Sequence, residues 1–251
     1  MQNFLASLRT PGSCRFGTWV KIPALETVEL LAHAGFDFIV IDMEHAPLTF
    51  ESAYRAIVVA QGLGMAALVR LPDQNNNDVQ RILDSGADGL LVPRVRSADE
   101  ARRAMDSMLF SPRGSRGLGI TSRAGRWGLL PTPAYVERGD QRIVRAIQLE
   151  DREALLDAER ILAVDGVNAA FIGLGDLALS TGLPAGHADN QALVDTLLAA
   201  GRRHGIPCGT AAGTAEAARQ FAERGFSFVM VSNDATLFGR AAQDLVKTLR
   251  G

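Results

Sequence analysis

The sequence predicts an α/β protein whose eight parallel strands close into a (β/α)8 TIM barrel. Short apolar runs rich in β-branched residues recur along the chain, and helix-like amphipathic stretches lie between them. The runs are apolar at nearly every position, which indicates strands buried on both faces, as in a parallel sheet covered by helices. Eight such units in 251 residues are typical of this barrel. We therefore expect a single domain over 1–251.

The expected strands and helices alternate in chain order. Amphipathic segments at 23–35, 50–64, 77–87 and 152–166 carry apolar residues at helical spacing. Glycines close the first three of these segments just before the next strand, which is typical of a helix C-cap followed by a short connection. The strands are expected at 15–20, 36–42, 65–71, 88–93, 142–150, 169–173, 206–211 and 226–232.

Residues 111–141 break this alternation between the fourth helix and the fifth strand. The segment is rich in Gly, Pro and Arg, and from Arg113 to Arg126 it carries four arginines and no acidic residue. Long loops in compact domains are usually functional or disordered. We expect a flap that covers the catalytic face and receives an anion. A solvated surface loop is the alternative.

Composition limits the classes of function. A formal net charge of -2 and a pI of about 6.1 favour neither nucleic acid nor an anionic membrane as a partner. The N-terminus lacks the apolar region of a signal peptide, and no apolar run approaches a membrane span, so we expect a cytoplasmic protein. Cys14 and Cys208 have no metal-type or redox-type spacing and are expected to be reduced, small hydrophobic residues.

The turn at 173–178 fits the dinucleotide fingerprint G-x-G-x-x-[GA] in sequence but not in context. Asp176 would face two phosphates, and the chain is interrupted at Gly182 where a long helix should continue. The next strand-like run begins only near Ile206, too late to supply the ribose-binding acid about 20 residues on. The turn and its aspartate therefore need another role.

Polar residues follow several expected strands at their carboxyl ends, where barrel enzymes carry their chemistry. Glu150 and Asp176 end adjacent strands with no Cys or His nearby, which suits a hard cation such as Mg²⁺, Mn²⁺ or Co²⁺. With two protein ligands, the other coordination positions would be left to water or substrate. Capping of the following helix is the alternative for each acid. The polar residues at the expected ends are Trp19, Lys21, Asp42, Glu44, His45, Arg70, Gln148, Glu150, Asp176, Asn233 and Asp234.

Arg70 and His45 are the candidate catalytic residues. The guanidinium of Arg70 is expected at the mouth, where its planar donors suit a 2-oxo acid or its enolate. A salt bridge with Asp42 or Glu44 is the alternative. His45 follows a buried strand beside acidic residues, as a general base would. We expect Asp42 to orient it or to bind substrate and Asp84 to hold the imidazole, with a packing histidine as the alternative.

The lysine content bears on the mechanism. The chain has two lysines, Lys21 and Lys247, and an imine-forming aldolase needs a buried lysine of lowered pKa. Lys247 lies in a polar C-terminal helix, and Lys21 follows the first strand close to a proline. Metal-assisted enolate formation is therefore favoured over imine formation.

Seven motifs in order give the chain a family resemblance. They are "GTW" (17–19), "IDMEHAP" (41–47), "LVRLP" (68–72), "LDSGADGLLVPRV" (83–95), "SPRGSRGLG" (111–119), "IQLE" (147–150) and "FIGLGDLALSTG" (171–182). With these the chain resembles the metal-dependent (class II) pyruvate aldolases of the 4-hydroxy-2-oxoheptanedioate aldolase family, which shares its barrel with the citrate lyase β-subunit type of enzyme.

The resemblance implies a role for each matching residue. Glu150 and Asp176 match the metal ligands, Arg70 the arginine that stabilises the pyruvate enolate, and His45 with Asp84 the acid/base machinery. The family often has Gly-Pro-Ala-Asp-Leu-Ser at the turn, whereas this chain has Gly-Leu-Gly-Asp-Leu-Ala. Arg94 adds a charge at the mouth of the fourth strand, which we expect to alter the acceptor pocket. We expect Arg116, then Arg123, to bind a carboxylate of the acceptor aldehyde. The expected substrate-binding residues are Trp19, Asp42, Arg116, Arg123, Gln148, Gly173, Leu174 and Gly175.

The resemblance implies reversible cleavage of 4-hydroxy-2-oxo acids into pyruvate, or hydroxypyruvate, and an aldehyde, with Mg²⁺, Mn²⁺ or Co²⁺ as cofactor. It also implies a hexamer of paired trimers in which the last helix packs on a neighbour. Two alternatives stay open. One is a carbon–carbon lyase acting on an acyl-CoA, with the arginine-rich loop holding phosphates, and the other is a barrel that binds a ligand without turnover.

Overall fold

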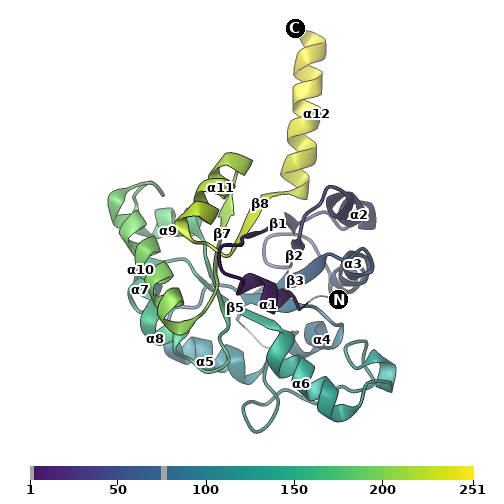
Figure 1. The fold of residues 1–251 in the computed structure, drawn as a ribbon. Coiled ribbons are helices and arrows are strands. Elements are labelled where there is room, and N and C mark those ends of the chain that lie inside the picture. Colours follow the sequence, from purple (N-terminus) through teal and green to yellow (C-terminus); the bar gives the residue numbers. More distant parts are fainter. Residues whose placement is uncertain (1–2, 75–77) are drawn as a thin grey trace.

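The computed structural model describes residues 3–74 and 78–251, and within them eight parallel strands form a closed barrel (Figure 1). The strands pair in chain order, and β8 pairs with β1 to close the sheet. The predicted (β/α)8 fold is confirmed. The strands are β1 (Arg15–Val20), β2 (Phe38–Asp42), β3 (Ala66–Arg70), β4 (Gly89–Val92), β5 (Val144–Leu149), β6 (Ala169–Ile172), β7 (Cys208–Ala212) and β8 (Phe228–Asn233).

Helices surround the barrel, except that α12 extends away from it (Figure 1). None of the helices within 3–74 and 78–251 combines the length and the apolar character that crossing a bilayer requires. Residue 77, the first of the expected helix at 77–87, lies outside the described residues. The helices are α1 (Phe4–Leu8), α2 (Leu25–His33), α3 (Phe50–Gly62), α4 (Val79–Asp84), α5 (Ala98–Asp106), the 3₁₀ turn η1 (Arg126–Gly128), α6 (Thr132–Arg142), α7 (Arg152–Leu156), α8 (Ala158–Leu162), α9 (Leu174–Thr181), α10 (Ala188–His204), α11 (Ala215–Arg224) and α12 (Asp234–Arg250).

The strands are buried on both faces, and successive side chains along a strand alternate between two hydrophobic cores, one inside the barrel and one under the helices. Along β2, Phe38 and Val40 belong to the cluster that fills the barrel, whereas Ile39 and Ile41 belong to the layer under the helices. Alternate side chains of a strand point to opposite faces, so an apolar residue is needed at every position of such a strand. This is the physical reason that continuous apolar runs predicted the barrel.

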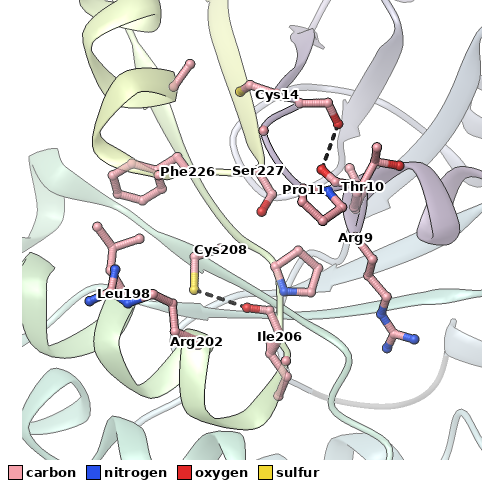
Figure 2. Close-up of a pocket in the computed structure, with 18 of the residues that line it drawn as sticks. Arg9, Thr10, Pro11, Cys14, Leu198, Arg202, Ile206, Cys208, Phe226 and Ser227 are labelled. Atoms are coloured by element: carbon pink, nitrogen blue, oxygen red, sulfur yellow. Dashed lines mark hydrogen bonds between the residues drawn. The ribbon is translucent and has the colours of Figure 1, made fainter.

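The amino-terminal end of the barrel is closed by apolar side chains. Helix α1 lies across this end (Figure 1), and its Phe4 ring packs 5.1 Å from the ring of Phe38. Beside it opens a cavity of about 810 Å³, between the α1–β1 connection, α10 and α11 (Figure 2). The cavity contains both cysteines, and each is a free thiol.

Burial makes both thiols unreactive. It raises the pKa of Cys14 to about 11 and that of Cys208 to about 12, so neither is ionised near neutral pH. Both side chains pack with the hydrophobic core, Cys208 buried and Cys14 partly buried, as expected of small hydrophobic residues. Because the cavity opens where strands begin, it lies opposite the end at which barrel chemistry takes place.

The structure corrects the expectation for residues 111–141. Part of the segment is helical, as η1 and α6, and the whole segment connects helix α5 to strand β5. A connection from a helix to a strand lies at the amino-terminal end of the barrel. Arg123 accordingly donates to the carbonyl of Ser85, which ends α4, and to Gln61 near the end of α3. The loop is therefore no flap over the mouth of its own barrel.

Gly17 provides a test of packing inside the barrel. A Cβ at this position of β1 would lie 2.5 Å from the carbonyl oxygen of Phe38 and 2.6 Å from its ring. We expect Gly17→Ala to destabilise the fold by about 1–3 kcal/mol, because neither the sheet nor the packed ring can yield freely. Urea unfolding followed by circular dichroism measures this loss.

Gly62→Ala is the matched control. A Cβ at Gly62, the last residue of α3, would meet no atom within 4 Å, so this change should be neutral or slightly stabilising. Equal stability of the two variants would contradict the packing argument.

Candidate active site

Asp42 is the centre of the polar groups at the carboxyl ends of the first strands. It ends β2, is fully buried, and pairs in register with Arg70 at the end of β3. Its two carboxylate oxygens accept hydrogen bonds from Nε and Nη2 of Arg70, at 2.9 and 2.8 Å, and from Nζ of Lys21. Burial alone would raise the pKa of Asp42, but these hydrogen bonds, with the charge of Arg70 and the His45 N–H, lower it to about 2. Asp42 is therefore an ionised anchor and not a proton carrier.

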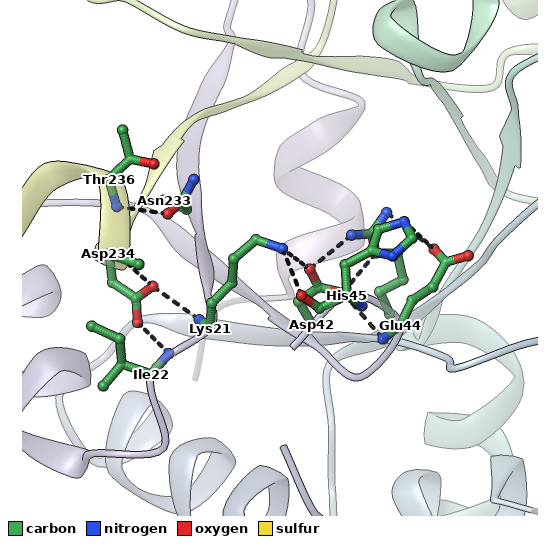
Figure 3. A network of polar contacts seen from close by, with 10 residues as sticks. Lys21, Ile22, Asp42, Glu44, His45, Asn233, Asp234 and Thr236 are labelled. Carbon is green, nitrogen blue, oxygen red and sulfur yellow. Dashed lines mark hydrogen bonds and ion pairs between the residues drawn. The ribbon is translucent and has the colours of Figure 1, made fainter. Parts of the chain in front are cut away.

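The same carboxylate shapes the turn after β2. The N–H groups of Glu44 and His45 both donate to Asp42 Oδ1, at 3.2 and 3.1 Å, as in an Asx-turn. The turn presents Glu44 and His45 side by side at the rim, with His45 Nε2 3.7 Å from Glu44 Oε2 (Figure 3). The imidazole is 61% exposed, so it is a rim residue and not a packing histidine.

Asp84, the expected partner of His45, does not lie beside it in the structure. It ends α4 and accepts hydrogen bonds from Tyr135 at 2.9 Å and from Arg116 at 3.2 Å. Because the ends of helices lie at the amino-terminal end of the barrel, a single chain does not bring Asp84 to His45. Glu44 is the acid beside the imidazole, and its place two residues after the strand end was a usable signal for it in the sequence.

Arg70 is held in one orientation by its neighbours. Besides the two bonds to Asp42, its Nη1 lies 3.2 Å from Glu44, and its guanidinium stacks 4.3 Å from the centroid of the Trp19 ring. Three of the five N–H groups of an arginine are thus engaged, and two remain for a ligand. The expected salt bridge with Asp42 or Glu44 forms, and it orients the group that was expected to meet the substrate. The ring of Trp19, which belongs to the core inside the barrel, packs against the guanidinium of this arginine.

Glu150 and Asp176 come together at the ends of β5 and β6. Burial and the charge of Asp176 raise the pKa of Glu150 to about 7, and Arg70 is near enough to oppose that rise. Gln148 donates to Glu150, while its own Oε1 is buried with no hydrogen-bond partner within the described residues. No cluster of three or more His, Cys, Asp or Glu side chains that could hold a metal occurs in 3–74 and 78–251.

This donor set fits a divalent cation. Two carboxylates under mutual repulsion and an unpaired amide oxygen are all hard oxygen donors. A cation held by two carboxylates alone keeps positions for water or a substrate oxygen.

The turn after β6 is built for close approach. Gly173 is the N-cap of α9, and a Cβ there would lie 3.1 Å from Glu150 Oε2 and 3.3 Å from Gln148 Nε2. The next N–H groups, of Leu174 and Gly175, belong to the first turn of the helix, and Asp176 stands in the same turn. α9 ends at Gly182 with φ 69°, as the sequence indicated. The arrangement offers backbone donors to a small anion beside the two carboxylates.

Two further cations adjoin the mouth. Lys21 follows β1, and its Nζ contacts Asp42 and the carbonyl of His45 (Figure 3). Arg94 follows β4 with a left-handed backbone, φ 55°, and its Nε lies 3.2 Å from Glu44. From the sequence, the charge of Arg94 was expected to alter the acceptor pocket, whereas Lys21 was assigned no role in binding.

Arg116 and Arg123 do not join them. Arg116 is buried against Phe110, Tyr135 and Asp84, and Arg123 binds Gln61 and Ser85. Neither arginine reaches the mouth of its own barrel, because the loop that carries them follows a helix and not a strand.

Comparison with known proteins identifies the family. The family model for HpcH/HpaI aldolase/citrate lyase matches residues 15–241. The chain belongs to this family. A 2-dehydro-3,6-dideoxy-6-sulfogluconate aldolase from Pseudomonas putida is 33% identical over 242 residues, 95% of this chain and 94% of the relative. A 5-keto-4-deoxy-D-glucarate aldolase from Salmonella arizonae is 32% identical over 238 residues, covering 94% and 92%.

Solved structures give the same result. An HpcH/HpaI aldolase/citrate lyase family protein from Burkholderia cenocepacia superposes with a TM-score of 0.91 at 30% identity over the whole of both chains. A citrate lyase β subunit from Mycobacterium tuberculosis, in complex with oxaloacetate and magnesium, shares the fold at a TM-score of 0.58, 16% identity and 91% and 95% coverage. The protein is thus a carbon–carbon lyase of the pyruvate aldolase type.

The raised pKa of Glu150 predicts a pH-dependent cost of folding. The folded protein without metal favours the protonated acid, so the cost of ionising Glu150 grows as the pH rises from the usual pKa of 4.5 to about 7. This cost is complete above pH 7 and absent below 4.5. We expect metal-free Glu150→Gln to melt roughly 2–4 °C above wild type at pH 8, the shift that ~1 kcal/mol produces in a domain of this size. Thermal melting of both proteins with a chelator present, at pH 4.5 and at pH 8, measures the difference in melting temperature.

The exposed Glu29→Gln in α2 is the control and should melt like wild type at every pH. An equal gain for Glu150→Gln at pH 4.5 and pH 8 would contradict the ionisation argument.

Proposed function

We propose that this lyase is a divalent-metal-dependent aldolase that cleaves 4-hydroxy-2-oxo acids reversibly into pyruvate, or hydroxypyruvate, and an aldehyde. One observation carries the proposal. Arg70 keeps two free N–H groups in a fixed orientation and acts electrostatically on Glu150, which is coupled to Asp176. Carboxylates for a cation and an oriented guanidinium are what an enolate needs. The relatives named above also act on sugar-type oxo acids, which supports a 2-oxo acid as substrate.

Glu150 and Asp176 would hold the cation, with the unpaired Oε1 of Gln148 next to it. When bound, a divalent ion supplies Lewis-acid polarisation of the 2-oxo group. Mg²⁺, Mn²⁺ and Co²⁺ all suit this oxygen donor set.

The chain's own residues would do the rest of the chemistry. The N–H groups at the start of α9 hold the substrate carboxylate, and the free N–H groups of Arg70 bind the oxygen on C2. His45, directly or through water, takes the proton of the C4 hydroxyl. The C3–C4 bond then breaks, its electron pair delocalises toward the oxygen on C2, and the aldehyde leaves. Protonation at C3 completes pyruvate, and the reverse order forms the new bond.

The proposal includes a second copy of the chain as partner. Helix α12 stands clear of the barrel (Figure 1), with Phe238, Leu245 and Leu249 exposed by 73%, 64% and 77%. Their spacing of seven and four residues places them on one helix face. We propose that this face packs on a neighbour in a hexamer of paired trimers, as the family resemblance implies.

Metal removal tests the mechanism directly. Chelation should abolish cleavage of a 4-hydroxy-2-oxo acid, and added Mn²⁺, Co²⁺ or Mg²⁺ should restore it. Asp176→Asn keeps the shape but loses a charged ligand, so it should weaken Mn²⁺ binding by at least tenfold and lower kcat together. Calorimetric titration with Mn²⁺ and a coupled pyruvate assay measure the two effects. Activity that survives chelation, with a borohydride-trapped pyruvyl adduct on Lys21, would refute the proposal.

Arg70→Lys tests the fixed guanidinium. Lysine keeps the charge but not the planar donors that Asp42 orients, so we expect kcat to fall by about 10² or more, as after loss of an oxyanion donor. Steady-state kinetics with Mn²⁺ at saturation separate this loss from metal binding. A variant that retained wild-type kcat would show that charge alone is sufficient at this position.

A further inference from the structure

The mouth of the barrel can be divided into two halves according to the strands that carry its polar side chains. Gln148, Glu150 and Asp176 stand at β5 and β6, and Arg70 stands at β3, so β3 to β6 form the half that would hold pyruvate. The aldehyde must then approach from the half formed by β7, β8, β1 and β2. This division rests on the proposed function.

That second half holds one lysine or arginine side chain at its strand ends, beside the imidazole of His45. Within three residues after β7, β8, β1 and β2, all of them described, Lys21 is the single Lys or Arg. Asp42 is fully buried and already neutralised by Lys21 and Arg70. The carboxyl end of β7 carries two small side chains, Ala211 and Ala212.

Lys21 is fixed at both its backbone and its side chain. The β1–β8 register slips between Gly17 and Trp19, where β8 contains one more residue than β1, and Ser232 takes a left-handed backbone with φ 57°. A bulge of this kind redirects the chain beside a site. It brings the carboxylate of Asp234 to the N–H of Lys21 at 2.9 Å (Figure 3).

The ammonium keeps capacity for a ligand. Of its three N–H groups, one meets Asp42 and one the carbonyl of His45 at 3.4 Å, which leaves the third unassigned among the described residues. The Lys21 side chain is 26% exposed, whereas the Arg70 side chain is 8% exposed. Within the ion-pair network that joins β1, β2, β3 and β4, the cations are Lys21, Arg70 and Arg94 and the acids are Asp42 and Glu44. Glu150 and Asp176 lie apart from this network, at β5 and β6.

We propose that Lys21 is the specificity-determining residue for the acceptor, and that it selects aldehydes bearing a distal carboxylate or similar oxyanion. The free N–H of its ammonium donates to that anion while the aldehyde carbon lies over C3 of the enolate. This role takes the place of the one expected for Arg116 and Arg123, which lie at the other end of the barrel.

The test compares aldehydes matched in length and different in charge. Succinic semialdehyde and pentanal serve as the acidic and the neutral acceptor, with pyruvate and Mn²⁺, and the readout is the ratio of their kcat/KM values. We expect wild type to favour the acid and Lys21→Met to reduce the ratio by about tenfold to a hundredfold, the value of one hydrogen bond to a charged group. Lys21→Arg should retain most of the ratio.

Arg94→Met is the matched control. It removes one cation from the same network, but from β4 in the pyruvate half, so the ratio should stay near the wild-type value. If Lys21→Met lowers kcat/KM for both aldehydes equally, the lysine only positions Asp42 and the inference is overturned. A wild-type enzyme without preference for the acid overturns it as well.

Exchange of the C3 protons of pyruvate in D₂O, followed by NMR, keeps this inference separate from the proposed function. Exchange by wild type without any aldehyde shows that the pyruvate half is active. If Lys21→Met then leaves the ratio of the kcat/KM values unchanged, that result counts against the role of Lys21 alone. Absence of both exchange and product with Mn²⁺ present refutes the proposed function and, with it, the role of Lys21.

Discussion

The buried carboxylate of Asp42 is the contact on which the rest of the mouth depends. It terminates β2, orients Arg70 through two hydrogen bonds, holds Lys21, and bends the chain so that Glu44 and His45 stand at the rim. A buried charge is costly unless it is fully paired, and here every oxygen has partners. Loss of this one group would leave Arg70 without its orientation and the following turn without its shape.

The carboxylates of the site lie in two different environments, which suit them to different roles. Asp42, surrounded by donors, has a pKa of about 2 and stays charged, whereas Glu150, beside Asp176 and partly desolvated, has a pKa of about 7. The first kind suits a structural anchor and the second a ligand that gains by receiving a cation. Environments that push like groups apart in pKa are a usual sign of assigned roles in an active site.

The sequence was sufficient to predict the barrel and most of the strand-end residues. A strand buried on both faces is a continuous apolar run, and its end is the point where polar residues begin, so both features can be recognised from the order of residues alone. It did not show that Arg116, Arg123 and Asp84 lie at the amino-terminal end of their own barrel, Asp84 at the end of α4 and the two arginines in the segment after α5. Which end of the barrel a loop occupies depends on whether it follows a strand or a helix, and residues 111–131 follow α5. The pairing of His45 with Glu44 depends on the Asx-turn at Asp42, which spacing alone does not specify.

The C-terminal helix is joined to this chemistry at its first residue. Asp234 begins α12 and accepts the N–H groups of both Lys21 and Ile22, at 2.9 and 3.0 Å, while Asn233 caps the same helix turn. The direction of α12 and the backbone position of Lys21 are therefore set by one buried carboxylate. Since α12 carries an exposed apolar face clear of the barrel, a neighbour packed on that face, as proposed above, would also fix the helix whose first turn supports the lysine. Through Asp234, the proposed assembly would thus be joined to the wall of the mouth formed by β8 and β1.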